Sequence, residues 1–198
     1  MENKEPEFSP EQSLKLISSM IETTKNSLND SSPYFLLWGW SAFLACLGQY
    51  ALKVWFHYPR HYDVWLIVPV VLVIHIIFVV RDSKRKRVKT FIDQAGSYLW
   101  IAIGLSFFAE AFVNSNIGWD HSYFSYSILY GIGTFVSGGL IKFRPLILGG
   151  LSCFLITIIS TFLMPDYQIL MLALALLTSY LIPGYLLRAK FRKQSQDV

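Results

Sequence analysis

Six apolar runs, each close to the length that a helix needs to cross a membrane, constrain this chain more than any other feature. A hydrocarbon core about 30 Å thick requires about 20 mostly apolar helical residues. The runs cover residues 33–54, 62–80, 98–113, 123–141, 145–163 and 167–187, and the third is the shortest. Lipid offers no hydrogen bonds to the backbone, and the runs lack strict alternation, so they favour helices over barrel strands. The predicted fold class is all-α, a polytopic bundle of six transmembrane helices.

The positive charges fall almost entirely on alternate loops. If the amino terminus lies inside, all 17 Lys and Arg residues except Lys53 and Arg60 lie on the inner side. Cytoplasmic loops carry an excess of these residues, so both termini are predicted to be cytoplasmic. The chain then divides into a cytoplasmic segment 1–32, a six-helix domain 33–187 and a basic cytoplasmic tail 188–198.

Composition excludes several classes of function. The net charge of +4 is spread over loop ends, as orientation requires, and does not indicate nucleic-acid binding. Cys46 and Cys153 lie within predicted spans and give no support for a disulfide framework. The sequence lacks a secretory signal before the first span, a phosphate-binding loop, a zinc-protease helix and a nucleophile elbow. We therefore expect a non-enzymatic protein without a cofactor, in a lipid bilayer, with tryptophans such as Trp65 and Trp119 anchoring span ends.

A short helix is predicted before the membrane domain. Ser9, Pro10 and Gln12 form an N-terminal helix signature, and we expect the helix to run to about residue 29. Its apolar side chains recur at three- and four-residue steps, which makes it amphipathic: Leu14, Ile17, Ile21 and Leu28. Three uses of the apolar face stay open, namely the inner leaflet, the bundle itself and another protein.

An internal repeat, Gly-x-Ser-x-Phe, occurs in each odd-numbered span. The three copies are Gly39, Ser41, Phe43; Gly104, Ser106, Phe108; and Gly150, Ser152, Phe154. The offset between the last two copies also relates Gly138 to Gly184 and Lys142 to Arg188 at the inner ends of the fourth and sixth spans. The repeat predicts three helical hairpins in the same orientation. Gly and Ser also allow close helix approach, so packing alone is the competing explanation.

Two ionisable residues within the spans are candidates for function. Glu110 is the only carboxylate well inside a predicted span, and a charge near mid-membrane costs about 2.5–3.5 kcal/mol on insertion scales. His75 lies halfway through the second span. Both residues have a functional reading, a proton or cation path, and a structural one, as hydrogen-bonded residues of the bundle. The loop residues His57, His61, Asp63, Asp120 and His121 do not form a convincing metal pattern, and no metal site is predicted.

The chain resembles small six-span bacterial inner-membrane proteins of unassigned activity. The resemblance is carried by Trp38-Gly39-Trp40, by Phe143-Arg144-Pro145-Leu146 followed by Gly149-Gly150, and by the Pro183-Gly184 pair near the end of the last span. It implies a multi-pass protein of the bacterial cell membrane and nothing about a substrate.

Two hypotheses of function follow. The first is a non-enzymatic accessory or regulatory subunit that acts through a protein partner, which fits the scarcity of ionisable groups in the spans and the spare amphipathic helix. The alternative is a small transporter or channel, alone or as a homo-oligomer, in which Glu110 and His75 line an intramembrane path.

Overall fold

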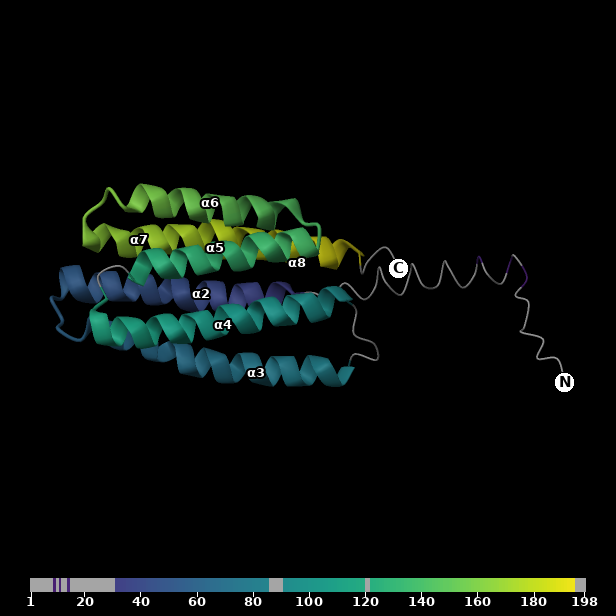
Figure 1. Cartoon of the computed structure of the whole chain (residues 1–198), viewed down its shortest axis with the longest axis horizontal. Coiled ribbons are helices and arrows are strands. Elements are labelled where there is room, and N and C mark those ends of the chain that lie inside the picture. Colours follow the sequence, from purple (N-terminus) through teal and green to yellow (C-terminus); the bar gives the residue numbers. More distant parts are fainter. Residues whose placement is uncertain are drawn as a thin grey trace.

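A computed structural model gives the fold of the chain (Figure 1). The structure describes residues 31–85, 91–119 and 122–194, together with Ser9, Glu11 and Leu14. All regular elements within these ranges are helices, which confirms the all-α fold class. The predicted amphipathic helix that ends near residue 29 lies outside the described residues, apart from those three isolated positions.

The helices follow the six apolar runs in order. They are α2 (Ser32–Tyr50) with the π-helical turn η1 (Ala51–Trp55), the 3₁₀ turn η2 (His61–Leu66) with α3 (Ile67–Arg85), α4 (Phe91–Ile117), α5 (Ser122–Leu140), α6 (Arg144–Ser160), and α7 (Pro165–Leu176), which continues through the π-helical turn η3 (Leu177–Leu181) into α8 (Ile182–Gln194). The expectation that the third span is the shortest is wrong for its helix. With 27 residues, α4 is the longest α-helix described, because polar residues such as Asp93 and Asn116 extend it beyond the apolar run at both ends.

Four stretches of helix are long and apolar enough to cross a membrane: Ser32–Trp55, His61–Asp82, Phe91–Ile117 and Pro165–Lys193. The helix α6 is apolar but has 17 residues, at the short end of the usual range. The helix α5 is not one of the four stretches, because glycine, serine and tyrosine lower its mean hydropathy. By length and composition, the apolar helices are those of a membrane protein.

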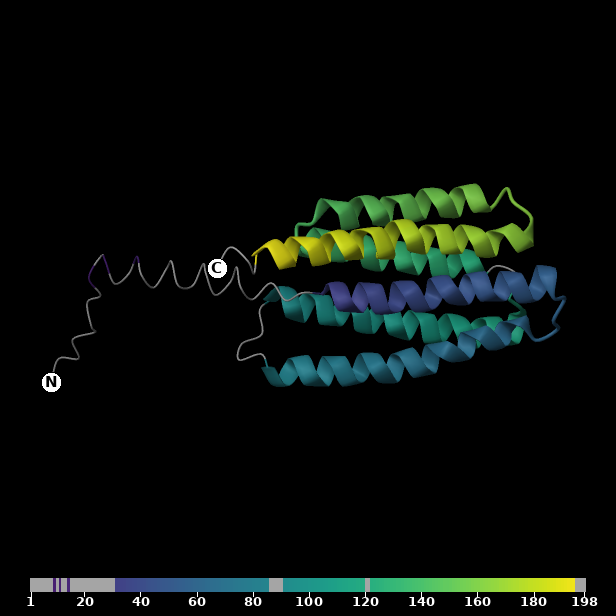
Figure 2. The same cartoon turned by 180° about the vertical axis from the view of Figure 1, so that it is seen from behind.

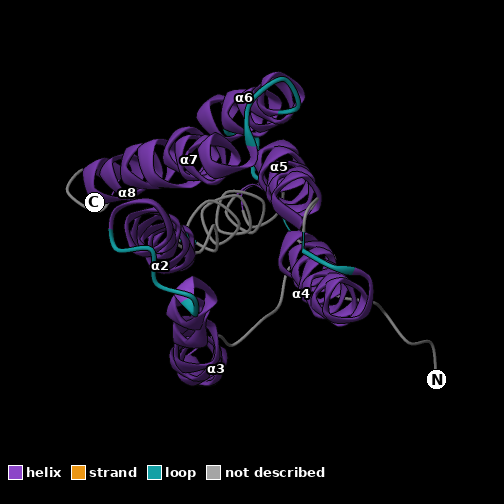
Figure 3. Cartoon of the chain, turned by 90° about the vertical axis from the view of Figure 1, so that its left-hand side faces the viewer, coloured by secondary structure: helices purple, strands orange, loops and turns teal. Residues whose placement is uncertain are grey.

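The helices lie side by side, and four of them form the packed core. Seen from the end, α2, α5, α6 and the continuous α7–α8 rod gather on one side, while α3 and α4 lie at the periphery (Figure 3). The helix α3 packs mainly on α2, and α4 mainly on α5. In the most apolar window of each, 6% of α3 and of α4 is buried, against 56% in α7–α8. The two peripheral helices therefore present most of their apolar surface outward.

The two ends of the bundle carry different segments (Figures 1 and 2). We call proximal the end at which α3, α5 and α8 finish, and distal the end at which η1, α4 and α6 finish. Basic residues lie at the proximal end: Lys142 in the α5–α6 turn, Arg144 at the start of α6, and Arg188 and Arg192 on α8.

Glycines allow close helix contacts at particular points. A Cβ placed on Gly150 would lie 2.6 Å from Cβ of Phe135 and 2.7 Å from its backbone nitrogen, so α5 and α6 approach there backbone to backbone. On Gly39, a Cβ would lie 2.9 Å from Cβ of Tyr180, and on Gly149 it would lie 2.9 Å from the carbonyl oxygen of Thr178. The turn η3 is therefore packed between α2 and α6.

The three copies of the repeat differ in their contacts. Gly39 and Gly150 sit at close helix crossings, whereas a Cβ on Gly104 would meet nothing within 4 Å. The three serines all bond a carbonyl of their own helix, but Ser152 also shares a hydrogen bond with Thr178, at 2.9 Å. Close packing therefore accounts for two copies of the repeat and not for the third.

The Pro183-Gly184 pair of the last span coincides with a break in regular α-helix. Proline lacks the N–H that would bond the carbonyl of Ser179, and the π-helical turn η3 ends two residues before Pro183. Pro183 is fully buried and lies 3.1 Å from a Cβ placed on Gly149, while one placed on Gly184 would lie 3.1 Å from Leu36. The irregular turn thus fits this rod between α2 and α6.

The turn between α5 and α6 gives a first prediction. Lys142 has a φ of 51°, and Phe143 N–H bonds the Gly138 carbonyl while Lys142 N–H bonds that of Gly139, the pattern of a Schellman motif. Because side chains disfavour this left-handed conformation, Lys142→Gly is expected to stabilise the protein by about 0.5–1 kcal/mol. Thermal unfolding in detergent measures the gain. Lys142→Ala removes the same charge but keeps a Cβ, so an equal gain there would contradict the backbone explanation.

Candidate functional site

His75 is held against α2 by two aromatic residues. The indole Nε1–H of Trp38 donates to Nδ1 of His75 at 3.2 Å, and the ring of Tyr34 meets the imidazole edge-on at 5.1 Å between centroids. About two turns towards the proximal end of α3, the Tyr34 hydroxyl donates to Oδ2 of Asp82. His75 therefore accepts a hydrogen bond from α2 and helps to attach the peripheral helix α3 to the core.

Glu110 lies in a different environment, on α4 beside α5. Its side chain is half-buried, and Nδ2 of the buried Asn114 donates to its Oε1 at 3.2 Å. A shallow depression of 450 Å³ surrounds it, lined by residues of α4 and α5: Ser106, Ala109, Glu110, Val113, Ser125, Ile128 and Leu129. The predicted residue thus occupies an open depression with two hydroxyls and one carboxylate.

The structure does not bring Glu110 and His75 together. The described contacts of His75 go to α2, and those of Glu110 go to its own helix and to α5. The helices that carry them, α3 and α4, are not close neighbours over the described residues. The two side chains are therefore members of separate clusters.

A third polar cluster, at the distal end, centres on Gln49. This glutamine of α2 is 0% exposed, yet it bonds residues of two other elements. Its Oε1 accepts from Nε1 of Trp65 at 2.7 Å, and its Nε2 donates to the hydroxyl of Tyr123 at 2.9 Å and lies 3.3 Å from Nδ1 of His61. One side chain therefore joins α2, η2 and α5.

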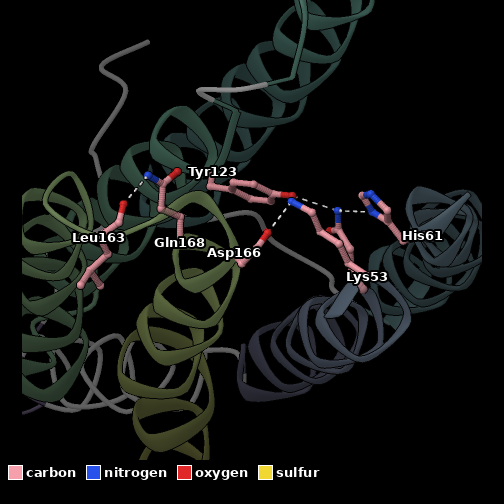
Figure 4. A network of polar contacts seen from close by, with 7 residues as sticks. Lys53, His61, Tyr123, Leu163, Asp166 and Gln168 are labelled. Atoms are coloured by element: carbon pink, nitrogen blue, oxygen red, sulfur yellow. Dashed lines mark hydrogen bonds and ion pairs between the residues drawn. The ribbon is translucent and has the colours of Figure 1, made fainter. Parts of the chain in front are cut away.

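An ion pair closes the same end of the bundle (Figure 4). Nζ of Lys53 on η1 lies 2.7 Å from Oδ1 of Asp166, in the first turn of α7, where the helix dipole favours a negative charge. Gln168 on α7 donates from Nε2 to the carbonyl of Leu163 at 3.1 Å. With the Gln49 cluster, these contacts hold the distal ends of α2, α5 and α7 in one polar layer.

Sequence reasoning missed Gln49 as the centre of this layer. A glutamine in an apolar run was the available signal, because an unpaired amide in lipid is costly. Its partners are far apart in sequence, and Trp65 and Tyr123 look like ordinary interface residues at the ends of spans. In the structure, the N–H of Trp65 donates to Gln49.

The loop histidines do not form a metal site with neighbouring side chains in the described part of the chain. Within residues 31–85, 91–119 and 122–194, no three His, Cys, Asp or Glu residues lie close enough to hold a metal ion. His61 is buried in the Gln49 cluster, whereas His57 is exposed and has a φ of 48°. Asp120 and His121 lie outside the described residues.

The Gln49 cluster requires one protonation state of His61. The indole of Trp65 can only donate, so it fixes Oε1 of Gln49 towards itself and turns the amide nitrogen towards His61. That nitrogen also only donates, so Nδ1 of His61 must accept and carry no proton. Charged groups of two other elements act on the ring, Lys53 of η1 and Asp166 of α7. Tyr123 of α5 accepts a hydrogen bond from the same amide nitrogen of Gln49.

This geometry predicts that acid destabilises the distal end. The unfolded chain protonates His61 freely at low pH, whereas the folded cluster excludes the proton from Nδ1, so stability falls as the pH drops below about 6.5. Thermal unfolding of the purified protein between about pH 8 and pH 5 measures the effect. The acid sensitivity should persist in His57→Gln, which changes an exposed histidine outside this cluster, and should shrink in His61→Gln. Equal sensitivity in both variants would contradict the assignment.

No known protein family, curated protein or solved structure matches this chain. The fold places it among α-helical proteins with several apolar helices able to cross a membrane. Any inference about its function therefore depends on the residues and geometry of this chain alone.

Proposed function

We propose that the chain is a non-enzymatic integral membrane protein that acts as an accessory or regulatory subunit of a partner protein. One observation carries the proposal: the polar residues of the apolar helices lie in separate clusters, and the His75 and Gln49 clusters hold helices together. A transport path or an active site would need such groups to converge. Two peripheral helices, α3 and α4, present apolar surface that a partner in the membrane can contact.

We further propose six crossings, arranged as three hairpins of the same orientation, with both termini in the cytoplasm of a bacterial cell and the protein in its inner membrane. Successive helical rods run in opposite directions, and the α5–α6 turn and the end of α8 carry their basic residues at the same end (Figure 1). At the distal end, Lys53 is paired with Asp166. This distribution supports a cytoplasmic proximal end.

Cysteine labelling tests the orientation. In a chain with Cys46 and Cys153 replaced by alanine, single cysteines at Arg60 and at Lys142 are treated in intact cells with a thiol reagent that does not cross membranes. Arg60→Cys should react and Lys142→Cys should react only after the membrane is opened. The reverse pattern would place the proximal end outside, and reaction of both would argue against an alternating topology.

Purification from native membranes tests the accessory role. The tagged full chain is extracted in mild detergent, its mass is measured, and every companion is identified with its stoichiometry. We expect one reproducible stoichiometric protein, absent when an unrelated membrane protein carries the same tag. A chain that comes out alone, or only as a homo-oligomer, would contradict the proposal.

The alternative, a small transporter or channel, draws on one observation, the open depression around Glu110 with its serine hydroxyls. Its test is proton and cation flux into vesicles that contain the purified chain. If the chain transports, Glu110→Gln should abolish flux while the protein still folds, because the neutral amide keeps the Asn114 hydrogen bond but not the charge. The accessory proposal expects no flux above that of empty vesicles.

A further inference from the structure

The depression around Glu110 has the features of a contact surface within the membrane. It lies between α4 and α5, and most of the α4 surface is uncovered. Small side chains, Ser106 and Ala109 on α4 and Ser125 on α5, line part of it, so another helix can approach closely. Apolar side chains, among them Val113 and Ile128, line the remainder.

The charge of Glu110 has no counter-charge in the described part of the chain. Asn114 gives a hydrogen bond to Oε1 of Glu110, and none of the described Lys, Arg or His residues forms an ion pair with this carboxylate. Carboxylates inside membranes usually pair with another group of the bundle or with a partner. Glu110 is therefore a carboxylate of an apolar helix with which no described cation is paired.

The depth of Glu110 restricts where that cation comes from. Glu110 lies seven residues before Ile117, the last residue of α4, which corresponds to about 10 Å along the helix axis. If the 27 residues of α4 are centred on the bilayer, the carboxylate lies about 5 Å inside the distal boundary of the hydrocarbon core. A cation must therefore be carried into the apolar layer by something that itself belongs there.

A second copy of this chain offers no suitable cation among its described residues. Its basic residues cluster at the proximal end, with the exceptions of Lys53 and Arg60. Lys53 is already engaged with Asp166 at 2.7 Å, and Arg60 lies in the loop before η2, outside the apolar helices. The missing cation thus points to a different protein.

We propose that the Glu110 depression docks a transmembrane helix of a partner protein, and that this helix presents a lysine or arginine to Glu110 about 5 Å inside the distal boundary of the hydrocarbon core. The inference rests on the proposed accessory function and specifies the partner by its chemistry. The partner's cation meets Glu110, and its backbone approaches over Ser106, Ala109 and Ser125.

Synthetic transmembrane peptides test this pairing directly. The full chain, with a fluorescent protein fused after Val198, is placed in phosphatidylcholine vesicles with a dye-labelled leucine-alanine peptide. One peptide carries a single lysine about 5 Å inside the distal boundary, and its control carries leucine there. Energy transfer should show the lysine peptide binding about tenfold more tightly, a difference of about 1.4 kcal/mol. Equal binding of the two peptides would overturn the proposal.

Matched variants of the chain locate the contact. Glu110→Gln keeps the Asn114 hydrogen bond and should remove the preference for lysine, and Ala109→Phe should block both peptides by filling the depression. Leu155→Phe places the same side chain at an exposed position of α6, outside the depression, and should leave the preference unchanged. A lysine preference that survives in Glu110→Gln would overturn the assignment.

Two further experiments distinguish a partner helix from other occupants of the depression. Dodecylammonium, a lipid-soluble amine, is added as competitor and as ligand, and binding of this amine without a preference for the lysine peptide would overturn the helix proposal. Glu110-dependent energy transfer between two differently labelled copies, without peptide, would overturn it in favour of a homo-oligomer. If a native companion is present but the peptides bind equally, only this inference is wrong. If no companion is found, the proposed accessory function itself is wrong.

Discussion

Replacing Gly150 with alanine should destabilise the protein by about 1–3 kcal/mol, because the added methyl group has no space between α5 and α6. Its Cβ would lie 2.6 Å from Cβ of Phe135, 2.7 Å from the backbone nitrogen and 2.8 Å from Cα of the same residue. These atoms belong to the backbone or are fixed to it, so no rotamer change relieves the overlap. The helices must move apart at the most extensive helix contact described.

The matched control is Gly104→Ala, in the equivalent position of the sequence repeat. A Cβ there would meet nothing within 4 Å, and alanine is the better helix former, so this variant should be neutral or more stable by up to about 1 kcal/mol. Gly138→Ala and Gly139→Ala give a second pair on α5, because a Cβ would lie 2.7 Å from the backbone nitrogen of Ile147 at the first and in open space at the second. Thermal unfolding followed by tryptophan fluorescence in detergent ranks the variants, and similar losses at Gly104 and Gly150 would refute this packing.

This contrast shows how far the repeat could be interpreted from sequence. Residue types and spacing indicate that Gly39, Gly104 and Gly150 occupy corresponding positions of three helices. They do not state which neighbour each helix has. Gly39 faces Tyr180 and Gly150 faces Phe135, but α4 is peripheral and leaves Gly104 uncovered. Equivalent sequence therefore produced different contacts, because contact depends on the packing of the whole bundle.

The helices themselves were largely predictable, because an apolar run of sufficient length has few alternatives in lipid. Their ends were less so: α4 and α8 continue through polar residues that hydropathy alone excludes. The residues that carry the polar clusters were only partly predictable. Glu110 and His75 stand out as ionisable groups in apolar runs, but their separation depends on which helices are neighbours. Gln49 is neutral, and its importance comes from partners on η2 and α5.

Replacing Gln49 with leucine is the second change expected to have a large effect, a loss of about 2 kcal/mol. Leucine has a similar size but leaves the indole N–H of Trp65 and the hydroxyl of Tyr123 without their partner at the distal end. Hydrogen bonds in membrane proteins are often worth less than 1 kcal/mol each, but stranded buried donors cost more than the net value of the bond. Gln168→Leu, the same change at a site 8% exposed, should cost less, because Gln168 bonds a single described carbonyl.

A double-mutant cycle decides whether the loss at Gln49 arises from Trp65. Trp65→Phe keeps an aromatic ring and removes the N–H that donates to Gln49. If Gln49→Leu destabilises the protein by leaving this N–H without a partner, the two losses should not add. The double variant should then lose less stability than the sum of the two single losses, by about 0.5–1 kcal/mol or more. Strict additivity would mean that the two side chains act independently. Coupling would instead show that one buried amide joins α2 to η2 through the indole N–H of Trp65.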